Sequence, residues 1–207
     1  MYLLFPFIKG LGLGLGMIIP IGAQNAYLIN QGIRRNFHLL AAMTCIICDV
    51  LLIGFGIFGA GELIARNETL LQLITMAGIV FLGWYGFSSF RRGIKGDPAI
   101  EFGETNPLTK GKRRVLLGAL AVTLLNPHAY LDTVVILGSI GNQMDQELRF
   151  AFALGTFSSS IIWFFALTTA AAKFAPWLSR PPVQRTIDII VGVVMWAIAT
   201  SLVHRLM

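Results

Sequence analysis

Apolar residues along this chain gather in long runs separated by short polar links, instead of alternating with polar positions as in soluble helices and strands. A bilayer core about 30 Å thick needs about 20 mostly apolar residues for each helix that crosses it. Six runs approach or exceed that length, at residues 5–32, 37–61, 70–90, 115–138, 150–172 and 186–203. The pattern therefore predicts an all-α integral membrane protein with six transmembrane helices, in which residues 1–207 form one transmembrane domain.

Composition agrees with this fold class. Hydrophobic residues make up 56% of the chain and charged residues 13%, which leaves too little polar surface for a soluble globule and too little charge for disorder. The net charge of +6 would suggest nucleic-acid binding in a soluble protein. Here the basic residues fall in the links, where they anchor loops, so the lipid bilayer is the expected partner and nucleic acid is not.

The longest polar link, residues 91–114, divides the six predicted helices into two halves of three. Halves with an odd number of helices insert in opposite senses, so we expect inverted repeats at about 5–90 and 115–203. Residues 24–28 (Gln-Asn-Ala-Tyr-Leu) resemble 127–131 (Pro-His-Ala-Tyr-Leu), and 78–80 (Gly-Ile-Val) resemble 192–194 (Gly-Val-Val). Matches this short also arise by chance in apolar sequence.

Lys and Arg collect in cytoplasmic loops, so their distribution predicts the side of each link. The links after helices 1, 3 and 5 hold twelve of them: Arg34, Arg35, Arg91, Arg92, Lys95, Lys110, Lys112, Arg113, Arg114, Lys173, Arg180 and Arg185. The opposite side holds four: Lys9, Arg66, Arg149 and Arg205. This predicts a cytoplasmic 91–114 loop and periplasmic termini. A re-entrant helix, leaving five spans, would instead move the N-terminus inside.

The first predicted helix is too long for one straight span, because about 28 residues at about 1.5 Å each make about 42 Å. Pro20 lacks a backbone donor and Gly22 accepts unusual dihedral angles. We therefore expect helix 1 to break there, directly before the polar residues Gln24 and Asn25.

The fourth predicted helix has a similar polar interruption. Asn126 and Pro127 lie at its middle, followed by His128, Tyr130 and Asp132. Broken helices occur in membranes where freed backbone groups line a wet cavity, and their ends can hold both a carboxylate and a cation, as an amino acid requires. Ordinary proline kinks, satisfied by neighbouring helices, are the alternative.

Two carboxylates, Asp49 in helix 2 and Asp132 in helix 4, lie within apolar runs, where an ionised group costs about 2.5–3.5 kcal/mol. They suit a site that accepts an ammonium or guanidinium group, or that takes a proton when the cation leaves. An internal ion pair or helix cap is the structural alternative. His128, one turn before Asp132, could exchange a proton with it or be a core residue. Asn126 and Tyr130 could bind substrate or tie the break together.

Other chemistry finds less support in the sequence. Cys45 and Cys48 lie inside helix 2 without nearby basic groups, which disfavours a membrane thiol carrier. Glycines at 10, 12, 14 and 16 have small-xxx-small spacings typical of close helix packing, which would allow a homodimer without requiring one. We find no metal-ligand cluster, nucleotide loop or nucleophile elbow, so we expect no enzyme, metal or cofactor, and a gradient must supply the energy.

The chain resembles the lysine/arginine exporter (LysE) family over essentially its whole length. The similarity is carried by residues 20–26 (Pro-Ile-Gly-Ala-Gln-Asn-Ala), 30–35 (Asn-Gln-Gly-Ile-Arg-Arg), 48–49 (Cys-Asp), 84–87 (Trp-Tyr-Gly-Phe) and 125–133 (Leu-Asn-Pro-His-Ala-Tyr-Leu-Asp-Thr). One departure is Ala23, where the family motif usually reads Gly-Pro-Gln-Asn, so the first break rests on Pro20 and Gly22 alone. The resemblance implies export of L-arginine or L-lysine across the bacterial inner membrane, driven by the proton motive force.

We therefore expect alternating access, in which the two repeats rock about a midplane site and Asp49 and Asp132 couple substrate to protons. The candidate substrate-binding residues are Gln24, Asn25, Asp49, Asn126, His128, Tyr130 and Asp132. Rival hypotheses are an exporter of neutral amino acids or other small cations, the thiol carrier, and a structural membrane protein without a substrate. Two broken polar helices would have no use in the last of these.

Overall fold

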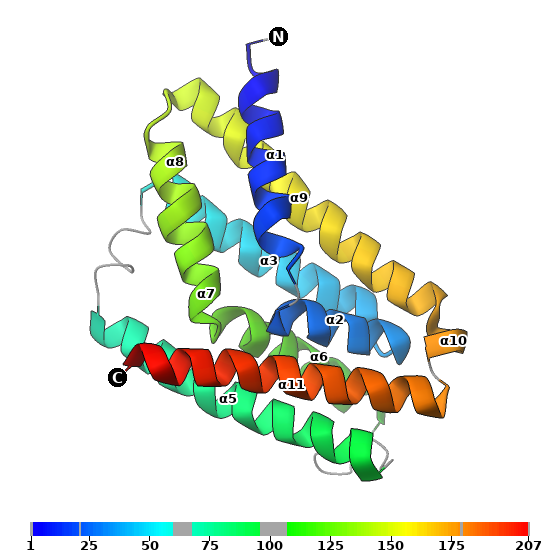
Figure 1. The fold of residues 1–207 in the computed structure, drawn as a ribbon. Coiled ribbons are helices and arrows are strands. Elements are labelled where there is room, and N and C mark those ends of the chain that lie inside the picture. Colours follow the sequence, from blue (N-terminus) through cyan, green and yellow to red (C-terminus); the bar gives the residue numbers. More distant parts are fainter. Residues whose placement is uncertain (1, 21, 60–67, 96–106, 179, 207) are drawn as a thin grey trace.

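The computed structural model describes residues 2–20, 22–59, 68–95, 107–178 and 180–206, and all regular structure within these ranges is helical (Figure 1). The elements are α1 (Leu4–Ile18), α2 (Ala23–Ile33), α3 (His38–Ile57), α5 (Glu68–Lys95), α6 (Pro107–Leu124), α7 (Pro127–Tyr130), the π-helix η1 (Leu131–Leu137), α8 (Gly138–Asn142), α9 (Gln146–Lys173), α10 (Ala175–Leu178) and α11 (Pro181–Leu206). The predicted all-helical fold is confirmed for this part of the chain.

Each predicted run contains helical structure, but several helices exceed their predicted bounds. α5, α9 and α11 extend past 70–90, 150–172 and 186–203 at both ends, and α6 begins at Pro107, inside the predicted 91–114 link. The length of an apolar run underestimates the length of the helix, because Lys, Arg and Glu are good helix formers that continue the helix beyond its apolar part. Proline also suits a first helical turn. The polar link is thus shorter than predicted, since both its ends are helical.

This extension corrects the role of Arg92, which the charge distribution assigns to a cytoplasmic link. Arg92 lies in α5 with a buried side chain, and its Nη2 is 3.1 Å from Oδ1 of Asp188 in α11. Its charge is paired inside the helix packing and does not act as a free loop charge. Asp188 falls in the sixth predicted run, where sequence reasoning did not single it out.

Three described helices are long and apolar enough to cross a membrane: His38–Ile57, Gln146–Lys173 and Pro181–His204. α1 and α2 supply a fourth crossing if they are taken together, but they are bent by 79° relative to each other. Such a pair is either a broken span or a re-entrant loop. The described residues thus support three or four of the six predicted crossings, while the count of six and the inverted repeat stay predictions.

The helices form two groups. α1, α2, α3, α6 and α9 pack around one another, whereas α5 and α11 lie along each other as a pair on one side (Figure 1). Trp196 joins this pair, because its Nε1 donates to the Gly83 carbonyl at 3.1 Å and its ring meets Phe90 edge-on at 5.2 Å. From the other group, α2 contributes Ala23 and Ala26 to an apolar cluster that also contains residues of α5 and α11. α2 therefore lies at the boundary between the groups.

Small residues let α1 approach α9 closely. A Cβ added at Gly10 would meet the Phe152 backbone, one at Gly14 would meet Ser159, and one at Gly155 would meet the α1 backbone. Positions 12 and 16 face open space among the described residues. The packing role predicted for the glycine series is therefore confirmed for two of its members.

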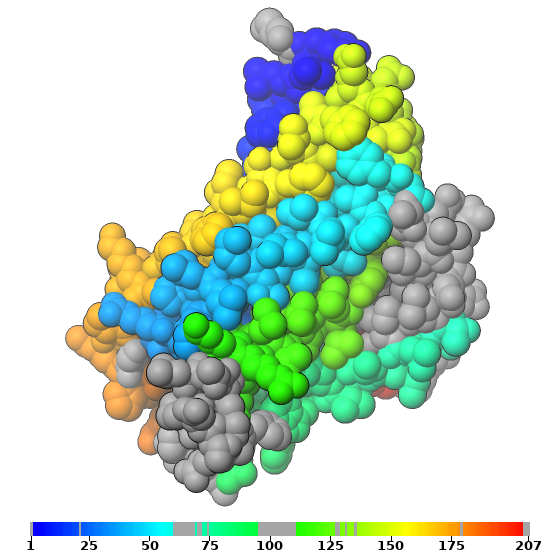
Figure 2. All heavy atoms as spheres, turned by 180° about the vertical axis from the view of Figure 1, so that it is seen from behind, coloured from blue at the N-terminus to red at the C-terminus, as the bar shows by residue number. Residues whose placement is uncertain are grey.

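The outer surface is apolar. Figure 2 shows α9, α3 and α6 side by side as diagonal bands from behind, and their outward positions include Phe55, Leu117 and Ile162. On α5, Val80 is 73% exposed. Soluble monomers rarely leave large apolar patches in water, whereas lipid chains solvate such a surface. The exterior is thus that of a membrane protein.

Candidate functional site

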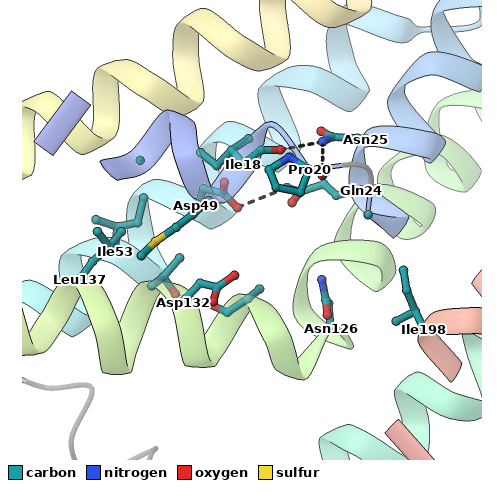
Figure 3. A pocket seen from close by; sticks show the side chains of 15 residues that line it. Ile18, Pro20, Gln24, Asn25, Asp49, Ile53, Asn126, Asp132, Leu137 and Ile198 are labelled. Atoms are coloured by element: carbon teal, nitrogen blue, oxygen red, sulfur yellow. Dashed lines mark hydrogen bonds between the residues drawn. The ribbon is translucent and has the colours of Figure 1, made fainter. Parts of the chain in front are cut away.

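A cavity of about 290 Å³ lies next to the C-terminal end of α1 (Figure 3). Its other walls come from α2, α3, α7, η1 and α11. It is lined by Gly14, Met17, Ile18, Pro20, Gly22, Gln24, Asn25, Asp49, Ile53, Asn126, Ala129, Asp132, Thr133, Leu137 and Ile198. Because Ile198 comes from α11, the cavity lies between the two helix groups. A few convergent polar groups in an apolar wall are typical of small-molecule sites.

Asp49 stands on the buried face of α3 and is only 4% exposed. Gln24 Nε2 donates to its Oδ1 at 3.2 Å, and the Ser160 hydroxyl donates to its Oδ2 at 3.4 Å. Gln24 is itself held in place, since the same amide nitrogen lies 3.2 Å from the Thr123 hydroxyl. These donors are neutral, so they orient the carboxylate without cancelling its charge. The group is suited to accept a cation or a proton.

Asp132 reaches the same cavity from the opposite wall (Figure 3). It belongs to η1, a π-helical stretch that sequence reasoning did not foresee, and π-helices frequently mark functional sites. The next residue, Thr133, donates its hydroxyl to the Ala129 carbonyl at 2.5 Å, which supplies a partner to a backbone group of the preceding turn. Two carboxylates from distant parts of the chain therefore border one space.

Asn25 also lines the cavity, but its amide is engaged with the protein. Its Nδ2 donates to the carbonyls of Ile18 at 2.6 Å and Pro20 at 3.0 Å, and its Oδ1 accepts from Trp163 Nε1 at 3.2 Å. These carbonyls lie at and after the end of α1, where the helix no longer satisfies them. Asn25 thus ties α1 to α2, while its predicted contact with substrate stays a prediction.

Some of the candidate residues in the fourth predicted helix line the cavity, and others do not. Asn126 lines the cavity between the end of α6 and the start of α7. Tyr130 is not among the lining residues, and its hydroxyl donates to the Leu124 carbonyl at 2.9 Å, as expected of a residue that ties the break together. The side chains of Pro127 and His128 lie outside the described ones. The structure thus brings Asn126 and Asp132 to the cavity and assigns Tyr130 a local backbone contact.

The N-terminus of α2 faces this space. Gly22 is the N-cap residue with extended geometry, and the Ala26 N–H donates to the Gly22 carbonyl at 3.0 Å. The backbone N–H groups of residues 23–25 therefore have no intrahelical acceptor, and the helix dipole adds partial positive charge. An anionic group would be favoured here, on the same cavity as the two carboxylates.

Several contacts to the site come from residues that sequence reasoning passed over. Ser160 and Trp163 of α9 hold Asp49 and Asn25, Thr123 of α6 holds Gln24, and Ile198 closes the wall. The signal available was the hydroxyl-rich stretch 156–160 (Thr-Phe-Ser-Ser-Ser) in an otherwise apolar helix.

The two cysteines of α3 form no disulfide with each other. Cys45 and Cys48 are free and buried; Cys45 accepts a hydrogen bond from the Thr123 hydroxyl at 3.7 Å, and Cys48 borders an apolar groove between α3 and α6. Within the described part of the chain, no group of three or more His, Cys, Asp or Glu side chains could hold a metal ion.

Comparison with known proteins identifies the relatives of this chain. Residues 15–206 match the family described as LysE type translocator. Similar proteins include the arginine exporter protein ArgO of Shigella flexneri, 47% identical over 95% of this chain and 92% of its own. The ArgO of Escherichia coli K12 is 46% identical over 95% and 92%. A putative amino-acid transporter, YggA of Aeromonas salmonicida, is 48% identical over 94% of both chains. No solved structure matches.

The family match covers nearly the whole chain, and the relatives are aligned across almost their full lengths. With its apolar exterior and membrane-spanning helices, the molecule is a multi-pass membrane transporter and not an enzyme. The chain belongs to the LysE-type translocator family.

Proposed function

We propose that this protein exports L-arginine across the bacterial inner membrane in exchange for protons, with L-lysine and toxic analogues as further substrates. The observation that carries the proposal is the pair Asp49 and Asp132, which border one cavity on a membrane protein. The nearly full-length similarity to proteins named as arginine exporters supports the choice of substrate.

The size of the cavity suits a single amino acid. About 290 Å³ stands at the lower end of the range of about 300–1,000 Å³ that small-molecule pockets occupy. Arginine carries a carboxylate and two cationic groups, and the cavity combines two carboxylates with the N-terminus of α2. The guanidinium and ammonium groups then pair with Asp49 and Asp132, and the substrate carboxylate with the α2 backbone. Gln24 and Asn126 add neutral hydrogen bonds around them.

The neutral surroundings of Asp49 support a role in proton coupling. A buried carboxylate without a cation is costly in its ionised form, so it is neutralised either by the substrate cation or by a proton. Expelling one positive charge against an interior-negative potential costs about 2.3 kcal/mol per 100 mV, and an incoming proton cancels that charge movement. Competition between cation and proton for one carboxylate would supply the exchange.

Alternating access of two inverted repeats remains the mechanism that we propose. The 79° bend between α1 and α2 and the end of α6 before Pro127 support interrupted first and fourth helices around the cavity. The ends of α2 and α9 and the start of α11 lie together at one end of the molecule, which is the end we take as cytoplasmic, with both termini periplasmic (Figure 1).

Counterflow of labelled L-arginine in proteoliposomes tests the substrate without assuming a direction. We expect unlabelled arginine, lysine and canavanine to compete, and homoserine and cadmium not to. Strong competition by homoserine would favour a neutral amino-acid exporter instead. Coupling is tested with Asp132→Asn: proton-driven export that stays at the wild-type level in this variant would refute the assigned role of Asp132.

A further inference from the structure

A second buried carboxylate site lies away from the cavity, where α2, α5 and α11 meet. Arg92 of α5 directs its Nε and Nη2 to Oδ1 of Asp188 in α11, at 3.2 and 3.1 Å. The rest of its guanidinium is held by Ser88, at 3.0 Å from Nη1, and Ser89, at 2.8 Å from Nη2. Asp188 is therefore a carboxylate that already binds a guanidinium in a largely buried setting, with side chains 9% and 14% exposed.

α2 adds its C-terminal end to this ion pair. Arg34 donates from Nε to Asn30 Oδ1 at 2.7 Å, and Asn30 is within side-chain hydrogen-bonding reach of Tyr85 on α5. Arg34 also lies within electrostatic range of Arg92 and Asp188. These five residues, Asn30, Arg34, Tyr85, Arg92 and Asp188, are called the gate cluster below. Because α2 also contacts α11, the gate cluster lies at the boundary between α2 and the α5–α11 pair.

The gate cluster stands in line with the cavity. Gln24 of α2 and Ile198 of α11 border the cavity. Arg34 lies ten residues after Gln24, and Asp188 lies ten residues before Ile198, so each is about 15 Å from the cavity along its helix. Between them, Ala26 of α2 packs with Val191 and Met195 in a buried apolar layer. A molecule moving between α2 and α11 from the end with the basic helix termini meets the gate cluster, then this layer, then the cavity.

Stability alone is a weak reason for such an ion pair. Replacing a buried pair with apolar side chains is often neutral or stabilising, and ionisable groups within membrane segments usually belong to transport pathways. The chemistry of this pair is that of the proposed substrate, because Arg92 presents a guanidinium to Asp188. A second guanidinium can take its place without any new type of contact.

We propose that Asp188 is an outer cation site, occupied here by Arg92, and that the guanidinium or ammonium group of an entering basic amino acid displaces Arg92 and opens the gate cluster. This inference rests on the proposed function. The displaced Arg92 and the nearby Arg34 then face the substrate carboxylate, while Asp188 holds its cation. The same displacement releases α11 from α5, which lets α11 move away from α2 and opens the path to the cavity.

Thiol accessibility tests the gate without relying on transport. Thr133→Cys, in a chain with Cys45 and Cys48 replaced by serine, puts one thiol on the cavity wall. A charged, membrane-impermeant thiosulfonate is added from the side of the 91–114 link, and the modification rate is measured. We expect Asp188→Asn to raise this rate about tenfold or more, because breaking a buried pair is strongly destabilising. L-arginine at a concentration near its KM, where much of the cavity is still empty, should accelerate the reaction with Asp188 present and not in Asp188→Asn.

Two further variants separate gating from a structural role. Arg185→Gln removes an exposed charge one turn before Asp188 and should leave the rate unchanged. The double change Arg92→Leu with Asp188→Leu preserves apolar packing, so a purely structural pair predicts the wild-type rate, whereas a gate predicts the fast rate of Asp188→Asn. This double variant also serves if Asp188→Asn does not fold.

Equal rates in the unchanged, Asp188→Asn and double-leucine chains would overturn the gate, whatever the substrate is. If arginine undergoes counterflow but does not speed modification, the displacement step is wrong and the proposed function stands. If arginine shows no counterflow at all, the proposed function and the displacement fall together, while faster modification of Asp188→Asn still demonstrates closure by the ion pair.

Discussion

Replacement of Asp49 with asparagine removes one charge from the proposed substrate site while keeping the shape of the side chain. Asp49 accepts hydrogen bonds from Gln24 and Ser160 on its two oxygens, and asparagine retains one acceptor while turning the other into a donor. A hydrogen bond to a charged group contributes about 1.5–3 kcal/mol, so its loss should raise the KM for arginine by about 10- to 150-fold.

Two assays on the same proteoliposomes distinguish binding from coupling. Counterflow gives the KM for labelled arginine, and an internal pH-sensitive dye reports proton movement during net transport. If Asp49 binds the cation, Asp49→Asn impairs both; if it carries only the proton, counterflow keeps a normal KM while the proton flux is lost. The matched control is Asp145→Asn, the same change at an exposed position before α9.

The reasoning about Asp49 would be refuted by a variant with unchanged proton flux and a KM within about twofold of the unchanged protein, the range typical of neutral surface substitutions. Such a result would mean that the buried carboxylate serves the packing of α3 against α9 rather than transport. Asp132→Asn, examined in parallel, shows whether the two carboxylates divide the roles or share them.

Three further changes test other parts of the structure. Trp163→Phe removes the indole donor to Asn25, and the loss of about 1 kcal/mol should slow arginine counterflow about fivefold with little change in melting temperature; an unchanged rate would exclude a positioning role. Gly14→Val clashes with α9 and should lower the melting temperature, because overpacking costs about 1–3 kcal/mol, whereas Gly16→Val faces open space and should not. Cys45→Ser combined with Cys48→Ser should retain counterflow, and its loss would instead support the thiol carrier.

The sequence was sufficient to single out several residues that line the cavity, because their chemistry stands out against an apolar background. Asp49 and Asp132 are visible as anomalies in apolar runs, and Pro20 and Gly22 mark the place where α1 ends. Each of these signals is local in the chain. That they meet at one cavity depends on the packing of α3 against η1, which the repeat hypothesis anticipates only in outline.

The supporting residues could not be found in the same way. Serine and tryptophan are common in membrane helices, so Ser160 and Trp163 acquire meaning only once the face of α9 that meets α2 and α3 is known. Asn25 shows the converse, because an amide beside a helix break suits substrate and backbone equally, and only geometry reveals its contacts to Ile18 and Pro20. Arg92 was misassigned since charge counting ignores where a helix continues.

α2 contributes residues to both the cavity and the gate cluster, so a movement of α2 would change both. At its start, Gln24 donates to Asp49; at its end, Arg34 lies within electrostatic range of the Arg92–Asp188 pair. Eleven residues form a short helix of three turns, too short to bend easily between those contacts. α2 contributes the small side chains of Ala23 and Ala26 to the apolar cluster that it shares with α11, and small side chains interlock less than large branched ones. A shift of α2 that opens the gate cluster must therefore also disturb the hydrogen bond that orients Asp49, so entry of a cation and release of a proton would be linked by one rigid element.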